Sequence, residues 1–206
     1  SSDLNLWFAS MGSGVWKHNP QANSFEKYIN KEGEPNSLSS NSVSSVMQDS
    51  KGRIWLSTDR GGICRYNAET NDFTSFSIKE GLPDDVAYEI LEDDAHNLWF
   101  GTNKGLVKFN PETKDIHVFT TKDGLLGNQF NYKSALKVGD GRFFFGGING
   151  LIAFDPNISR QQLAPPSPIY ISKFSIYNKE ITVHTPNSPL KKNIVGTEEI
   201  VLPYNQ

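Results

Sequence analysis

The chain has 206 residues, a formal net charge of −3 and 36% hydrophobic residues. This length allows one or two domains, and the composition is that of a folded chain and not of a disordered one. The slight acidity gives no electrostatic footprint for nucleic acid, so we expect no nucleic-acid partner. No apolar run approaches the roughly 18 residues of a membrane span, so membrane attachment is expected only through parts of a parent protein. Cys64 is the only cysteine, which excludes an intrachain disulfide and a cysteine-rich zinc site.

Four segments of the chain repeat one pattern, in which an aromatic residue is central to an apolar strand. The aligned aromatic positions are Trp7, Trp55, Trp99 and Phe144, at spacings of 48, 44 and 45 residues. Propeller blades have periods of roughly 40 to 50 residues. Helical repeats of similar period exist, but these segments are rich in Trp, Phe, Val and Ile and are interrupted by Gly, Asn, Asp and Pro. That composition is typical of strands and turns.

The predicted strands follow one another in chain order within each unit. They cover 6–10, 14–20 and 25–28 in the first unit, 43–48, 54–58, 62–67 and 73–76 in the second, 86–91, 98–102, 105–111 and 116–119 in the third, and 130–136, 143–147 and 150–156 in the fourth. The first unit lacks its first strand and the fourth has no clear last strand. The aromatic strands are apolar at consecutive positions, so both of their faces must be covered. A blade between two other blades has that environment.

We therefore predict an all-β chain in three parts. A partial β-propeller of about four four-stranded blades covers 1–158, a proline-rich linker covers 159–168, and an incomplete β-sandwich segment covers 169–206. Within the last part, strands are predicted at 169–177, 181–183 and 200–202. A domain of about 40 residues is marginally stable alone, so we expect the chain to be a piece of a longer protein.

Residues 41–67 and 86–110 closely resemble the two-component regulator propeller repeat, and the pairs that begin at Gly81 and Gly124 match its Gly-Leu prelude. Residues 168–174 resemble the start of the Y-Y-Y β-sandwich that follows such propellers. The resemblance implies the periplasmic sensor region of a Bacteroidetes hybrid two-component system histidine kinase, of the type that detects glycan breakdown products. The kinase of such a parent is absent from this chain. Phe144 replaces the Trp of the repeat, and the 138–141 turn lacks its Asp.

The candidate ligand-binding residues lie on the connections between blades and on the turns between the second and third strands of a blade. In a propeller, these segments converge on one face, around the central channel. Their amide, hydroxyl and charged groups suit an oligosaccharide or another small polar ligand, although all of them can equally be turn residues. The candidates are Asn41, Ser42, Asp59, Arg60, Asp84, Asp85, Asn103, Lys104, Asn128, Gln129, Asn131 and Asn149.

No catalytic residue, metal site or cofactor is predicted. The Trp residues are expected in the core, and Asp49 and Asp93 are expected to bond to the backbone of their own turns. The four histidines lack metal-ligand spacing. We expect a binding and sensing module, with a propeller enzyme such as a lyase or glycosidase, or a protein-interaction scaffold, as alternatives. Self-association is also expected, by isologous pairing of the apolar faces of the first and last blades.

Overall fold

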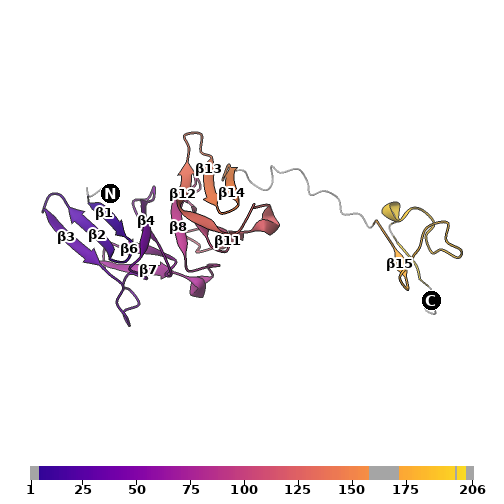
Figure 1. Ribbon diagram of the computed structural model, residues 1–206, viewed down its shortest axis with the longest axis horizontal. Helices are drawn as coiled ribbons and strands as arrows, with labels where there is room; N and C mark the ends of the chain where they lie inside the picture. Colours follow the sequence, from indigo (N-terminus) through magenta and orange to yellow (C-terminus); the bar gives the residue numbers. More distant parts are fainter. Residues whose placement is uncertain (1–4, 158–171, 198, 203–206) are drawn as a thin grey trace. The chain divides into compact units, whose positions relative to one another are not determined.

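The computed structural model describes residues 5–157, 172–197 and 199–202 (Figure 1). The chain divides into two compact units, Ser1–Ser159 and Arg160–Gln206. No helical segment among the described residues is long and apolar enough to cross a membrane. The predicted linker at 159–168 lies outside the described residues, and the predicted domain boundaries stay predictions.

The first unit consists of four antiparallel sheets of consecutive strands, which we number as blades 1 to 4 (Figure 1). Blade 1 contains β1 (Leu6–Ser10), β2 (Gly14–Asn19) and β3 (Ser24–Tyr28), and blade 2 contains β4 (Val43–Gln48), β5 (Ile54–Thr58), β6 (Ile63–Asn67) and β7 (Asp72–Phe76). Blade 3 contains β8 (Ala87–Glu92), β9 (Leu98–Thr102), β10 (Leu106–Phe109) and β11 (Ile116–Phe119), and blade 4 contains β12 (Phe130–Lys137), β13 (Phe143–Gly147) and β14 (Gly150–Phe154). The all-β propeller prediction is confirmed, with three strands each in blades 1 and 4.

In blades 2 and 3, the aromatic strand β5 or β9 contributes to two apolar clusters, one on each side of its blade. Trp55 packs in one cluster with Phe100 of blade 3, whereas its neighbour Leu56 packs in another with Val15 of blade 1. The same arrangement recurs one blade further on, where Trp99 packs against blade 4. We call the side toward the next blade the forward face and the side toward the preceding blade the backward face. Both faces of blades 2 and 3 are covered, as the apolar strands predicted.

Capped 3₁₀ turns connect blade 2 to blade 3 and blade 3 to blade 4. In η1 (Ile78–Glu80), Ser77 and Glu80 form a capping box, and Gly81 ends the turn at φ 106°. Leu82 then enters the core at 3% exposure. Because η2 (Thr121–Asp123) repeats these caps, the Gly-Leu pairs of the sequence mark where each turn ends.

The described part of the second unit contains one short hairpin, of β15 (Ser175–Ile176) and β16 (Lys179–Glu180), and the 3₁₀ turn η4 (Ile194–Gly196). The predicted strand at 181–183 is wrong. Tyr177 and Asn178 have φ of 47° and 61°, so the tight turn comes earlier than the sequence suggested. The predicted strand at 200–202 is also wrong, since none of the described strands pairs with it. The Y-Y-Y resemblance stays a prediction.

Candidate functional site

Three of the predicted ligand residues hold their own loops together. The side-chain oxygens of Asn41, Asp85 and Asn128 accept hydrogen bonds, of 2.7, 2.8 and 2.8 Å, from a backbone N–H earlier in the same connection. Each bond closes the loop that joins one blade to the next. For these three residues, the structure favours the turn interpretation that the sequence left open.

Of four further candidates, three form local hydrogen bonds and one is exposed to solvent. The carbonyl of Ser42 accepts from the N–H of Asp59 at 2.8 Å, and the carbonyl of Gln129 accepts from a backbone N–H at 3.1 Å. The Asn149 amide donates to a loop carbonyl at 3.2 Å. Asn131 is exposed on β12. Ser42, Gln129 and Asn149 therefore shape the connections.

The remaining five candidates gather around two tyrosines that the sequence analysis missed. Tyr88 on β8 and Tyr132 on β12 have ring centroids 4.7 Å apart in an edge-to-face arrangement. The Tyr88 hydroxyl donates to Asn103 Oδ1 at 2.7 Å, and Lys104 Nζ lies 3.5 Å from Asp84 Oδ2. Tyr88 is 6% exposed and Tyr132 is 44% exposed, so the pair runs from the core to the surface. We call this group the tyrosine site: Asp59, Arg60, Asp84, Tyr88, Asn103, Lys104 and Tyr132.

The tyrosine site is electrostatically balanced. Burial raises the pKa of Tyr88. The neighbouring Tyr132 and then the negative charges of Asp84 and Asp59 raise it further. Burial also raises the pKa of Tyr132. The negative charge of Asp59 raises this pKa further, and the positive charge of Arg60 lowers it. Both phenols therefore stay protonated at neutral pH and can donate a hydrogen bond. Because the site holds two carboxylates and two cations, it suits a neutral polar ligand better than a strongly charged one.

A bulge brings Tyr132 to this position. The pairing of β12 with β13 shifts register between Phe130 and Ala135, and Lys133 between them has φ 51°. β12 has eight residues, whereas β4 and β8 have six each. β-bulges re-aim side chains and are common beside functional sites. The extra length of the fourth unit before Phe143 was the available sequence signal.

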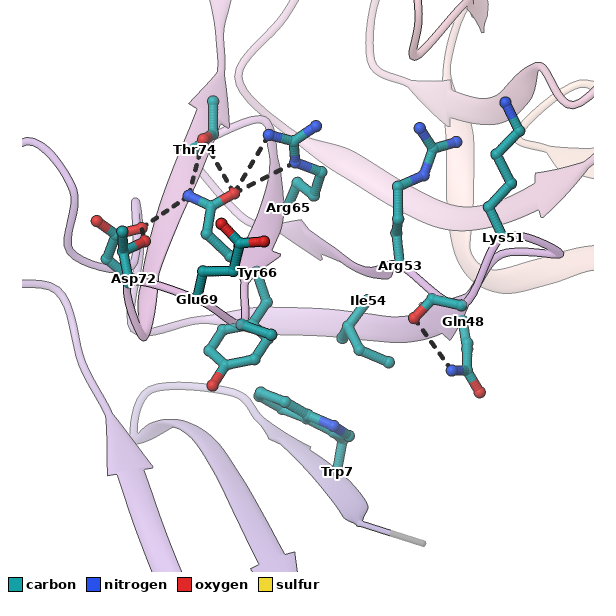
Figure 2. Close-up of a pocket in the computed structure, with 14 residues that line it drawn as sticks. Trp7, Gln48, Lys51, Arg53, Ile54, Arg65, Tyr66, Glu69, Asp72 and Thr74 are labelled. Atoms are coloured by element: carbon teal, nitrogen blue, oxygen red, sulfur yellow. Dashed lines mark hydrogen bonds between the residues drawn. The ribbon is translucent and has the colours of Figure 1, made fainter. Parts of the chain in front are cut away.

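A separate cavity of about 750 Å³ lies at the end of blade 2 opposite to Asp59 and Arg60, and it is lined by residues of the β4–β5 and β6–β7 turns (Figure 2). The rings of Trp7 and Tyr66 lie on one side of it, and the side chains of Arg53 and Arg65 on the other. None of the predicted ligand residues lines this cavity. Arg53 already forms an ion pair with Asp49 at 2.6 Å, so one of the two arginines that line the cavity stabilises the fold.

The described residues contain no group of three or more His, Cys, Asp and Glu side chains placed to hold a metal ion. Asp49 and Asp93 bond to their own turns, as predicted, through backbone N–H groups 2.8 to 3.1 Å away. Each also accepts a hydrogen bond from an indole, from Trp55 at 2.9 Å and from Trp99 at 2.8 Å. These carboxylates are therefore structural and face the core.

Residues 37–60 and 81–104 match the family model of the two component regulator propeller. These segments are two-component regulator propeller repeats. Each match covers the approach to a blade, its first two strands and the start of the next turn, in blades 2 and 3. The repeats therefore include Asp59, Arg60, Asp84, Asn103 and Lys104 of the tyrosine site.

Two relatives support the same family. The extracellular domain of the hybrid two component system BT3049 from B. thetaiotaomicron is 26% identical, with a TM-score of 0.68 over 88% of this chain and 25% of that one. Histidine kinase P4 of Formosa agariphila is 30% identical over 120 residues, which are 58% of this chain and 9% of the kinase. The chain thus spans about a quarter of the first relative and a small part of the second. The extracellular origin of the first agrees with the predicted periplasmic location.

An enzyme shares the fold more distantly. The H270A virginiamycin B lyase from Staphylococcus aureus is 14% identical, with a TM-score of 0.53 over 76% of this chain and 54% of the lyase. This likeness shows a common propeller architecture and carries no argument about chemistry.

Proposed function

We propose that this chain is a ligand-sensing extracytoplasmic part of a hybrid two-component sensor kinase, whose ligand is a carbohydrate breakdown product. In this proposal, the ligand binds at the tyrosine site, and the signal passes to a kinase outside this chain. The repeats and the similarity to an extracellular domain of a hybrid two component system support the sensor role.

The observation that carries the ligand proposal is the convergence of aromatic and polar groups from three blades. Tyr88 and Tyr132 come from the first strands of blades 3 and 4, and Asp59 comes from the β5–β6 turn of blade 2. Aromatic faces pack against the C–H faces of sugar rings, while amide, carboxylate and ammonium groups bond to hydroxyls. A site with no net charge favours a neutral saccharide.

The test is calorimetric titration of the chain with a library of neutral and uronate-containing oligosaccharides, with product analysis of each mixture. We expect a neutral oligosaccharide to bind without being cleaved. Tyr132→Ala should weaken its binding about tenfold, since one aromatic contact of about 1.4 kcal/mol corresponds to that factor. Asp59→Ala combined with Arg60→Ala should also weaken binding, with little change in melting temperature, because the Arg60 side chain is 87% exposed and the Asp59 side chain is 25% exposed.

The matched control is Tyr177→Asn, which removes a tyrosine that is 86% exposed in the hairpin of the second unit. Asn tolerates the left-handed backbone at that position, so this variant should bind like the parent chain. Equal binding by the Tyr132→Ala variant would refute the tyrosine site, and turnover of a glycan would favour the enzyme alternative.

A further inference from the structure

Blade 2 departs from the repeat in two segments at the end of the blade that carries the tyrosine site. The β3–β4 connection, 29–42, is four residues longer than the connections 77–86 and 120–129 that lead into blades 3 and 4. The β5–β6 turn, 59–62, is one residue longer than the turn 103–105 of blade 3. Blades 3 and 4 pack into the propeller with the shorter segments, so packing does not require the extra residues.

The two longer segments hold one another in place. The Ser40 hydroxyl donates to the Asp59 carbonyl at 2.7 Å. Gly61 lies so close to the β3–β4 connection that a Cβ there would be 2.5 Å from Ser39 Oγ. Arg60, between Asp59 and Gly61, has φ 70°, which is uncommon for residues other than glycine. Such backbone conformations cluster at ligand sites, where the surrounding structure maintains them.

A groove of about 700 Å³ lies between these two segments and the outer strand of blade 2, and we call it the blade 2 groove. Its volume is within the roughly 300–1,000 Å³ of pockets that hold a drug-sized molecule, which is larger than one sugar ring. Hydroxyl and amide side chains line it from the β3–β4 connection, from β7 and from the N-cap of η1: Asn30, Asn36, Ser37, Ser39, Ser75 and Ser77.

The charged side chains of the groove nearly cancel. Three cations and four carboxylates line it. Lys31 pairs with Glu34 at 3.2 Å, and Glu80 accepts hydrogen bonds within the cap of η1. Lys79 lines the groove from the middle of η1 with an exposed side chain, so its ammonium group can donate to a ligand. Like the tyrosine site, the groove suits a neutral polar ligand.

Arg60 belongs both to the tyrosine site and to the groove. Burial raises the pKa of Tyr132 and the nearby charge of Arg60 lowers it, while the Arg60 side chain, which is 87% exposed, lines the groove. The adjacent residues Asp84 and Asp85 join the two sites in the same way. Asp84 lies 3.5 Å from Lys104 in the tyrosine site, and Asp85 lines the groove. A ligand that extends from the tyrosine site past Arg60 therefore enters the groove.

We propose that the blade 2 groove is a second subsite, which binds those units of a linear neutral oligosaccharide that extend beyond the tyrosine site. This inference rests on the proposed function, since it takes the tyrosine site as the place where the first unit binds. Units in the groove meet hydroxyl, amide and ammonium groups from three segments of the chain. Because the translational freedom of the ligand is lost only once, contacts in the groove add to affinity. The chain should therefore select oligosaccharides by length.

The test is calorimetric titration of the 206-residue chain with the maltose, cellulose, xylan and mannan series, each from the monosaccharide to the hexasaccharide. We expect one series to bind, with a steep rise in affinity at the length that reaches the groove. Lys79→Ala should weaken the longer members about tenfold, as expected for a hydrogen bond from a charged group, and leave the shortest binding member unchanged. Tyr132→Ala should weaken every member.

The matched control is Lys122→Ala. Lys122 holds the same place in η2 that Lys79 holds in η1, and its side chain is also exposed, but it lies outside the groove. This variant should bind every length like the parent chain, and thermal unfolding verifies that both lysine variants fold. Equal affinity at all lengths, or equal weakening of short and long members by Lys79→Ala, would overturn the groove and leave the tyrosine site standing. Absence of binding by all four series would overturn both.

Discussion

Removal of the Asp49 carboxylate should destabilise blade 2 far more than is usual for a residue in a turn. Its side chain is fully buried and accepts hydrogen bonds from Trp55 Nε1 at 2.9 Å and from Arg53 Nε at 2.6 Å. It also accepts from the backbone N–H groups of Lys51 and Arg53, at 3.1 and 2.8 Å. One carboxylate therefore ties the turn to the core indole of the same blade.

The expected cost follows from the donors that the substitution leaves behind. A buried donor without a partner costs about 1–3 kcal/mol, and loss of one partner of a buried ion pair costs about 3–5 kcal/mol. Arg53 keeps its bond to Glu112 at 2.8 Å, which limits the loss. We expect Asp49→Val to lower the free energy of unfolding by about 3–4 kcal/mol. Trp55→Phe removes one donor and some volume, and should cost about 1–2 kcal/mol.

Blade 4 shows that the two substitutions are compatible when they occur together. Val138 and Phe144 replace the Asp and Trp, yet the turn keeps its backbone bond, from Val138 N to Arg142 O at 3.0 Å. The corresponding bond from Asp49 N to Arg53 O is 2.9 Å. With both partners gone, no indole N–H is left without an acceptor. The double variant should therefore cost about 1–2 kcal/mol less than the sum of the single variants.

The four proteins of this cycle are compared by urea unfolding, followed by far-UV circular dichroism at one protein concentration so that association is held constant. Asp140→Val is the matched control, because this carboxylate is 53% exposed and pairs with Arg142 at the surface. It should change stability by no more than about 0.5 kcal/mol. Additivity of the two single variants within about 0.5 kcal/mol would refute the coupling.

Two further predictions concern one glycine and one carboxylate. Gly62→Ala should destabilise the chain more than Gly124→Ala, since both have positive φ but a Cβ on Gly62 meets the Phe76 carbonyl at 1.9 Å, whereas Gly124 has open space; equal losses in urea unfolding would contradict this. The pKa of Glu112 is lowered from 4.5 by hydrogen bonds from two cations of blade 2. Its contribution to stability is present above that pH and lost as the pH falls below it, so Glu112→Gln should flatten the fall in melting temperature from pH 6 to 3; an unchanged slope would contradict the ion pair.

The propeller could be predicted because the pattern of its aromatic strand occurs four times in the sequence. Consecutive apolar residues around Trp55 and Trp99 require two covered faces, and the structure buries both residues. The turns η1 and η2 were missed, although Ser77 and Glu80 have the spacing of a capping box. In the second unit, the predicted strand at 181–183 was wrong because the positive φ of Tyr177 moves the turn, and propensity alone gives no sign of that.

The candidate site was predicted only in part, for a physical reason. Polar loop residues look alike in a sequence whether they bond to the backbone of the same connection, as Asp85 does to Ile78, or face solvent, as Arg60 does at 87% side-chain exposure. Only the fold separates the two groups. Tyr132 was missed because its position depends on a shift in strand pairing; the extra length of the fourth unit indicates such a shift but not which side chain it re-aims.

The repeat itself indicates where specificity resides. Positions that pack one blade on the next recur along the chain, because every interface has the same geometry. The first strands of blades 2, 3 and 4 lie side by side, but there the repeats differ. Blade 2 has Ser44, which bonds to the Ala87 carbonyl at 2.9 Å, where blade 3 has Tyr88 and the blade 4 bulge adds Tyr132. Tyr88 is 6% exposed and packs in the apolar cluster between blades 3 and 4, whereas Tyr132 is 44% exposed. The Tyr132 ring is therefore the difference that packing explains least, and it is the one that a ligand at the proposed site would contact.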